Sequence, residues 1–265
     1  MARKRLSLLA TGLVTLLYNP SSASAQSNPN LGNATSFAVL AGSQVTNTGA
    51  TSIWGNVGIS PGIGVPPHFT GFGTVTFTGG GSVHDADGAA AAAQLDSGIA
   101  SGALDAQGCT FTYAGTRELA GNILLPGVHC ATQFLLTAGT LTLNGAANNV
   151  WIFKSASDVV VSGGAAARVV SPSCNVWWRA VSSTTLSANT SLVGNVFADI
   201  SVTLAAGATL TGRAFARTAE VTLSSNAINV CNPAAVPTLS QWAFFSLALL
   251  LASAGVVALR RGTAA

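Results

Sequence analysis

The C-terminal half of the chain alternates apolar and polar residues in short runs that recur at a nearly constant interval. Residues 195–212 read NVFADISVTLAAGATLTG, and residues 213–230 read RAFARTAEVTLSSNAINV. In this alignment Phe197 falls over Phe215, while the VTL triplets at 202–204 and 221–223 nearly coincide. An interval of roughly 18 to 20 residues is typical of one coil of a β-solenoid and is too short for a propeller blade.

The alternation within each unit predicts which side chains form the core. Val202 and Leu204 are expected to point inward, and Thr203 and Thr209 to point outward. Stacked coils would bury an inner row that a single coil cannot bury. The aromatic residues of successive units are expected to form a ladder inside the solenoid; they are Phe197, Phe215 and Trp177 or Trp178. Trp54, Trp177 and Trp178 are expected to pack in the core or at a coil edge rather than to serve as platforms for a sugar.

One segment breaks the β pattern. Residues 85–107 read DADGAAAAAQLDSGIASGALDAQ, and this alanine-rich run predicts a helix from about 86 to 104 that lies along the solenoid. Its apolar face is expected to consist of Leu95, Ile99 and Leu104. Asp85 is expected to be the N-cap residue. A metal site built from His84, Asp85 and Asp87 is the less favoured interpretation of the same stretch.

The two ends of the chain resemble targeting segments. Residues 1–25 contain a basic start, an apolar run and the small-residue site Ala23-Ser24-Ala25, which predicts a secretory signal peptide cleaved after Ala25. Near the other end, residues 243–259 form an apolar run of about the length of a membrane span, and Arg260-Arg261 closes it. Residues 236–242, VPTLSQW, resemble the IPTL-type C-terminal sorting signals of Gram-negative bacteria, with Val236 where isoleucine is usual. The resemblance implies that residues 233–265 hold a precursor in the inner membrane until a sorting protease passes the protein to the cell surface or outside.

Charge and composition narrow the function of the remaining chain, residues 26–232. This part contains six basic and eight acidic residues, which leaves a formal net charge of −2 and no basic surface for nucleic acid. Low charge together with 49% apolar residues in the whole chain also argues against disorder. We expect one β-rich domain, a monomer, with no cofactor and no metal.

Four cysteines remain in this exported region, and their even number suggests two disulfides. Three pairings are open. We expect Cys109–Cys130, which brackets a single segment, and Cys174–Cys231, which brackets the repeats. Because the chain has no CxxC pair, a zinc site is not expected.

Three segments together resemble a known family. They are residues 31–62, LGNATSFAVLAGSQVTNTGATSIWGNVGISPG; residues 117–130, RELAGNILLPGVHC; and residues 174–230, from CNVWW to the end of the repeats. In this order they are similar to the microbial ice-binding proteins. The resemblance implies a mainly β fold, a right-handed discontinuous β-solenoid with one long flanking α-helix, in which the N-terminal segment folds back to complete the stack.

The resemblance also implies a flat wall that binds ice through short outward motifs of the Thr-Ala/Gly-x-Thr/Asn type. Two places match, Thr48 to Thr51 and Thr137 to Thr140, and three equivalent turns carry degraded versions. The residues expected to contact ice are Thr48, Thr51, Thr137, Thr140, Asn189, Thr190, Ser191, Ala208, Thr209 and Ser225. Threonine suits this task because it presents a methyl and a hydroxyl group on one stiff rotamer, and small side chains lose little entropy on contact.

Two other functions compete with ice binding. A surface adhesin or matrix protein without affinity for ice would share the export signals and the solenoid. A β-helix carbohydrate-active enzyme would need clustered carboxylates, whereas Asp158, Asp199 and Glu220 are spread over different units. The alternative is that these three share one edge in successive coils. His68, His84 and His129 have no evident nucleophile as a partner, so no catalytic residue is expected.

Overall fold

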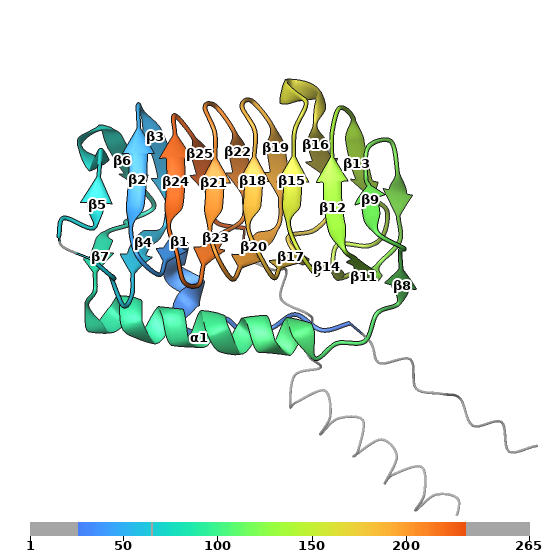
Figure 1. Ribbon diagram of the computed structural model, residues 1–265, viewed down its shortest axis with the longest axis horizontal. Coiled ribbons are helices and arrows are strands. Elements are labelled where there is room, and N and C mark those ends of the chain that lie inside the picture. The colour runs from blue at the N-terminus through green and yellow to red at the C-terminus, as the bar shows by residue number, and fades with distance from the viewer. Residues whose placement is uncertain (1–25, 65, 232–265) are drawn as a thin grey trace, which may run out of the picture.

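The chain folds into coils that each add one strand to three parallel sheets. The computed structural model describes residues 26–64 and 66–231. Figure 1 shows the coils stacked side by side, with the helix α1 (Gly88–Asp105) running along the stack. The described part is therefore mainly β, as the repeats predict.

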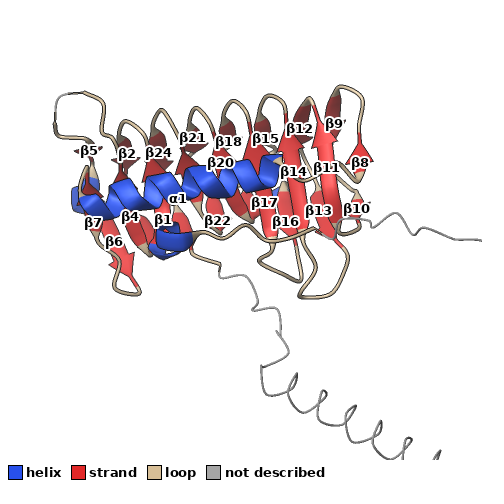
Figure 2. Ribbon diagram, turned by 90° about the horizontal axis from the view of Figure 1, so that it is seen from below, coloured by secondary structure: helices blue, strands red, loops and turns tan. Residues whose placement is uncertain are grey.

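Sheet A has nine strands, and α1 lies across its outer side, as Figure 2 shows. In spatial order the strands are β7 (Val83–Asp85), β4 (Asn56–Ile59), β1 (Phe37–Ala41), β23 (Ala214–Ala216), β20 (Asn195–Ala198), β17 (Val176–Ala180), β14 (Trp151–Ser155), β11 (Gly127–Ala131) and β8 (Phe111–Thr112).

Sheet B has eight strands, and no helix of the described residues covers its outer face, as Figure 1 shows. Its order is β5 (Phe69–Thr70), β2 (Val45–Thr48), β24 (Val221–Ser224), β21 (Val202–Leu204), β18 (Thr184–Leu186), β15 (Val159–Val161), β12 (Gln133–Leu136) and β9 (Thr116–Glu118).

Sheet C also has eight strands and completes each coil. Its order is β10 (Ile123–Leu124), β13 (Thr140–Leu143), β16 (Arg168–Val170), β19 (Ser191–Val193), β22 (Thr209–Thr211), β25 (Ala227–Asn229), β3 (Thr51–Trp54) and β6 (Val75–Thr78). Three short 3-10 helices, η1 (Gly32–Ser36), η2 (Phe72–Thr74) and η3 (Gly164–Ala166), lie in the connections.

The order of the coils in space differs from their order in the chain. β1 pairs with β23, β2 with β24 and β3 with β25, so the N-terminal coil lies against the last one. Val39 and Ala214 are register partners although they are far apart in sequence. The two ends of the described chain thus hold each other in one continuous stack of strands.

The core fills the inside of the coils, with a second layer between sheet A and α1. Val202 and Leu204 are buried, whereas Thr203 is partly exposed and Thr209 exposed, as the alternation predicts. Phe153 stacks on Trp178 inside the coils, with ring centroids 4.1 Å apart.

The predicted aromatic ladder needs a correction. Phe197 contacts Phe215 at 5.2 Å between ring centroids, but both belong to the layer beneath α1, together with Trp177. Val196 and Ala198 point into the coils, so the residue between them must point out. Because α1 covers this outer side, sheet A is apolar on both faces, and the alternation in sequence does not distinguish them.

The helix begins later than predicted, because Ala86 adopts a left-handed conformation with φ 49° and delays it to Gly88. Asp87, not Asp85, is the N-cap residue, and its side chain accepts a hydrogen bond from the Ala90 N–H at 2.8 Å. Asp85 instead ends β7 and lies 2.7 Å from Nδ1 of His68.

The face of α1 that packs on sheet A also differs from the prediction. Leu104 is buried, but Leu95 and Ile99 are exposed, at 68% and 62%. The buried positions are small instead; besides Leu104 they are Ala90, Ala93, Ser97, Ala100 and Ser101. Small side chains let the helix approach the bulky rings on the outside of sheet A closely.

Both predicted disulfides are present. Cys109 pairs with Cys130, and Cys174 pairs with Cys231. The first ties the segment after α1 to β11, and the second ties the end of the repeats to the start of β17. The two pairs follow one another along the chain without crossing, as bracketing predicts.

The expected signal peptide, residues 1–25, and the expected sorting segment with its apolar run, residues 233–265, lie outside the described residues. Within residues 26–64 and 66–231, no helix is long and apolar enough to cross a membrane.

Candidate functional site

Sheet B presents a row of threonines on its outer side. Register pairing joins Thr185 to Thr203, Thr203 to Thr222, Thr222 to Thr46 and Thr46 to Thr70. Five successive strands thus carry a threonine at the same outward position. Because neighbouring strands lie about 4.7–4.9 Å apart, the row has a regular repeat along the stack.

Short neutral side chains flank the threonine row on the side toward sheet C. Ser224 is the register partner of Thr48, and Ser187 and Ala205 occupy the same position in the coils beyond. Alternate residues of a strand are separated by roughly 6.6–6.8 Å. The two rows therefore form a grid of methyl and hydroxyl groups with two fixed spacings.

On the other side of the threonine row the grid becomes more polar. The hydroxyl oxygens of Ser183 and Ser201 are 2.9 Å apart, and Gln44 Nε2 donates to Glu220 Oε2 at 2.6 Å. These groups bond to one another along the stack. Their mutual hydrogen bonds hold the side chains in place beside the threonines.

The residues predicted from sequence gather at the corner between sheets B and C. Thr48, Thr137, Asn189, Thr209 and Ser225 are exposed there. Thr140 and Ser191 are partly exposed at the start of their strands in sheet C.

Three of the predicted residues lie beneath this corner. Thr51, Thr190 and Ala208 are buried, at 2%, 1% and 0% exposure. Thr51 Oγ1 donates to Asn47 Oδ1 at 2.6 Å, and Thr190 Oγ1 donates to the Ser187 carbonyl at 2.7 Å. Their side chains satisfy the backbone and side-chain groups of the turn rather than facing out.

The corner has the same backbone conformation in four successive coils. Asn189, Gly207, Ser225 and Gly49 all have positive φ, between 50° and 77°. Glycine adopts this conformation without strain, and asparagine is among the residues that tolerate it best. Repetition of one turn keeps the edge of the grid straight.

The far end of the corner carries charge. Glu118 accepts hydrogen bonds from Thr137, at 3.1 Å to its N–H and 2.9 Å to its hydroxyl. Burial raises the pKa of Glu118, but the N–H groups of Ala120, Thr137 and Leu119 and the Thr137 hydroxyl outweigh it and hold this pKa below its ordinary value. Arg168 Nε donates to Thr140 Oγ1 at 3.1 Å. In the stretch that contains β18, β21, β24, β2 and β5, the threonine row and the row toward sheet C are neutral, and Glu220 is a charged group beside them.

Reasoning from sequence did not include four members of the threonine row among the site residues, namely Thr46, Thr70, Thr185 and Thr222, and it used Thr203 only as an example of an outward residue. The signal was present in the alignment of the VTL triplets at 202–204 and 221–223, whose register the structure confirms. The middle residue of each triplet points out because its neighbours point in.

The carboxylates that a glycosidase would need do not converge. Asp199 binds Arg179 at 2.8 Å, and Asp158 accepts from the Ser183 N–H at 3.0 Å. Asp158 and Glu220 occupy the same position in register, but two intervening coils place Ser183 and Ser201 between them. Across the described residues there is no group of three or more His, Cys, Asp or Glu side chains that could hold a metal ion.

Comparison with known proteins gives consistent matches. The ice-binding-like family matches residues 39–229, and the IPTL-CTERM motif matches residues 234–261. The chain is 32% identical over 217 residues to an ice-binding protein of Nostoc sp. (strain HG1), covering 79% of this chain and 77% of that one.

Two solved structures are similar in fold. The crystal structure of an ice-binding protein from an Antarctic biological consortium superposes with a TM-score of 0.71 at 30% identity, covering 86% of this chain and 96% of that one. The ice-binding protein of the Antarctic ascomycete Antarctomyces psychrotrophicus gives a TM-score of 0.70 at 34% identity, and 78% of this chain covers 100% of it.

Proposed function

The chain belongs to the ice-binding-like family, and on this basis we propose that the domain binds ice crystals through the outer face of sheet B. The observation that carries the proposal is the register of Thr185, Thr203, Thr222, Thr46 and Thr70 in adjacent strands. The exposed corner residues Thr48, Asn189, Thr209 and Ser225 extend the site at its edge, and the buried Thr51, Thr190 and Ala208 support that edge from below.

The physical basis is a match between a rigid grid and ordered water. Each threonine holds its methyl and hydroxyl groups on a stiff side chain, so water over the row is already positioned before contact. Contact with the crystal then costs little side-chain entropy. A charged side chain would keep its own hydration shell. The threonine row from β18 to β5 contains none, and the carboxylate of Glu220 beside it accepts a hydrogen bond from Gln44.

For the fold, we propose a right-handed, discontinuous solenoid. The pairing of β1 with β23 supports discontinuity, because the first coil in the chain joins the last. For processing, residues 1–25 serve export, residues 26–232 form the binding domain, and residues 233–265 direct sorting by an inner-membrane protease. The match of the IPTL-CTERM motif to residues 234–261 supports a location at the cell surface or outside. We also propose that the domain acts as a monomer.

The rival proposal is a surface adhesin or matrix protein without affinity for ice. The deciding experiment is partitioning of the purified domain, residues 26–231, into a slowly growing ice hemisphere. Ice binding predicts enrichment in the crystal and inhibition of recrystallisation. Exclusion from the ice, with crystal growth identical to buffer, would favour the rival.

A further inference from the structure

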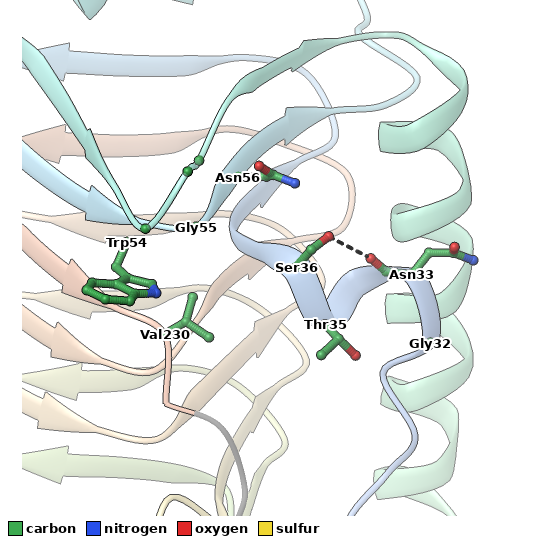
Figure 3. A pocket seen from close by; sticks show the side chains of 11 residues that line it. Gly32, Asn33, Thr35, Ser36, Trp54, Gly55, Asn56 and Val230 are labelled. Carbon is green, nitrogen blue, oxygen red and sulfur yellow. Dashed lines mark hydrogen bonds between the residues drawn. The ribbon is translucent and has the colours of Figure 1, made fainter.

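A second candidate site lies away from sheet B, where sheet C turns into sheet A. It is an open cleft of about 550 Å³ between η1 and the ends of β3 and β6. In Figure 3, Trp54 and Val230 lie on one side of the cleft, and Thr35 and Ser36 of η1 lie on the other. This volume is within the usual range for small-molecule sites, roughly 300–1,000 Å³.

Trp54 is exposed, so it does not pack in the core; it lies at the coil edge, at the end of β3. Its side chain is 53% exposed, whereas Trp151, Trp177 and Trp178 are 0–1% exposed. This large aromatic ring therefore adds little to the core, and it stands instead on one side of the open cleft.

The ring is nevertheless held in place. A Cβ atom added at Gly79 would lie 2.6 to 2.9 Å from three atoms of the indole, so the bare backbone of Gly79 covers one face of the ring. Gly79 has φ 65°, which suits glycine. The close approach fixes the indole from one side, and such a prearranged surface loses little entropy when a ligand covers it.

The polar groups around the cleft are neutral and offer hydrogen bonds. Asn56 Oδ1 accepts from the Ser82 N–H at 3.0 Å, and this leaves Asn56 Nδ2 directed away as a donor. Asn33 points toward α1, as Figure 3 shows, where its Nδ2 donates to Asp96 at 2.7 Å, and its backbone carbonyl accepts a hydrogen bond from the Ser36 hydroxyl at 3.4 Å. The Thr35 and Ser36 hydroxyls complete the set. None of the residues that line the cleft is charged.

We propose that this cleft binds a neutral saccharide, with a sugar ring stacked against Trp54 and its hydroxyl groups bonded to Asn56, Thr35 and Ser36. A sugar has an apolar C–H face for an aromatic ring and many hydroxyls for amides. The uncharged lining disfavours phosphorylated and other ionic ligands, which would lose their hydration without gaining a partner. Because the cleft and the threonine row lie on different sides of the coils, the domain can hold a polysaccharide and a second surface at once.

The test uses the intrinsic fluorescence of residues 26–231. The solved chain from Antarctomyces psychrotrophicus is matched over its whole length by 78% of this chain, and we expect residues 26–231 to fold on their own. It retains four of the five tryptophans of the chain, and only Trp54 among them is exposed. The probes are cellobiose, maltose and N,N′-diacetylchitobiose at concentrations up to about 50 mM, which detects millimolar affinity.

We expect a saturable change in emission with at least one disaccharide. Because Trp54→Ala removes the responding fluorophore, isothermal titration calorimetry measures the affinities of the variants and of the unaltered domain. Trp54→Ala should weaken the affinity at least about tenfold, or about 1.4 kcal/mol, and Thr35→Val, which removes one hydroxyl, should weaken it several-fold. Ile123→Ala is the matched control, because Ile123 is 68% exposed in the same outward row of sheet C at the other end of the stack. Its affinity should equal that of the unaltered domain.

The proposal is overturned if no disaccharide gives a saturable change, or if Trp54→Ala binds as well as the unaltered domain. It is also overturned if a longer chain, residues 26–242 with Trp242→Phe, protects Trp54 from acrylamide and no longer binds sugar, because the C-terminal segment would then be the occupant. Partitioning of Trp54→Ala into ice should be unchanged, which separates this outcome from the test of ice binding.

Discussion

Thr203 in β21 and Thr222 in β24 are register partners, and both side chains are partly exposed on the outer side of sheet B. In both strands the flanking residues are buried valine and leucine. Because side chains alternate along a strand, each threonine must point outward. The pair is the unit from which the whole row is built, because the next strands on either side repeat it with Thr185 and Thr46.

The first prediction concerns the centre of this row. Thr203→Tyr should abolish ice binding, because a ring standing above the grid keeps the crystal away from several threonines at once. Far-UV circular dichroism should stay unchanged, since the position faces solvent and surface substitutions usually cost less than about 0.5 kcal/mol. The measurement is recrystallisation inhibition together with partitioning into ice.

The matched control is Thr211→Tyr, an exposed outward position on sheet C. This variant should retain full activity. An equal loss in both variants would show that the binding surface is not confined to sheet B. Thr209→Tyr and Thr140→Tyr test the corner; we expect Thr140→Tyr to matter less, because Arg168 already occupies that part of the surface.

The second prediction is a gain of activity. Val160 is the register partner of Thr185, so Val160→Thr would lengthen the threonine row by one coil. The two side chains have nearly the same shape, and the position is partly exposed, so the hydroxyl is not stranded in an apolar core. Ice recrystallisation should be inhibited at a lower protein concentration.

Val193→Thr is the control for this gain. Val193 is also partly exposed, but it is the register partner of Thr211 in sheet C. No improvement is expected there. If Val193→Thr improves activity and Val160→Thr does not, sheet C rather than sheet B contacts the crystal.

The repeats and the disulfides could be predicted from sequence because they follow from local regularity. Coils of similar length place Phe197 beside Phe215, and four cysteines leave few alternatives. Local regularity does not indicate which element of the chain packs against the outer side of each sheet. The outward position of Phe197 depends on α1, which comes from a distant part of the chain.

The candidate site was predicted less well for a related reason. Thr140 begins its strand as the register partner of Arg168. Thr51 lies one residue earlier relative to its own coil, and its hydroxyl oxygen accepts a hydrogen bond from the N–H of the buried Asn226. The motifs Thr48 to Thr51 and Thr137 to Thr140 look alike in sequence, but their corners differ in length. As a result Thr51 is buried, whereas Thr140 is partly exposed. The central row depends on strand register alone, which is why the aligned VTL triplets carried a signal for it.

The third prediction concerns the attachment of the helix. Arg179 is 4% exposed and binds Asp105 at the end of α1 at 3.0 Å and Asp199 at 2.8 Å. Burial lowers the pKa of Arg179, but its hydrogen bonds to Asp199 and Asp105 outweigh this, and the pKa is raised. Arg179→Ala leaves two neighbouring carboxylates without their shared cation, and we expect a loss of about 2–3 kcal/mol in the free energy of unfolding.

Urea denaturation at pH 7 measures this loss. Arg217→Ala is the control, because Arg217 is exposed and should change the free energy of unfolding by less than about 0.5 kcal/mol. Ice binding of the folded Arg179→Ala variant should persist, since α1 and sheet B lie on different sides of the coils. Equal stability of the two variants would mean that packing alone holds the helix.

The fourth prediction concerns the N-cap of α1 and its dependence on pH. The Ala90 N–H and the His84 side chain lower the pKa of Asp87 below its ordinary value. Asp87→Ala removes the cap and should cost about 1 kcal/mol at pH 7, whereas Asp87→Asn keeps a capping oxygen and should cost less.

The charge of Asp87 determines how its cap responds to acid. A carboxylate with a lowered pKa in the folded protein contributes stability that is complete above its unfolded pKa, about 3.9, and is lost as the pH falls through the folded value. Unaltered protein should therefore be more stable than Asp87→Asn at pH 7, and this advantage should shrink below about pH 4. Urea denaturation of both proteins at pH 7 and pH 3 measures the difference. A constant difference at both pH values would show that the carboxylate charge of Asp87 does not contribute to the cap, and that its oxygen acts only as a neutral acceptor for the Ala90 N–H.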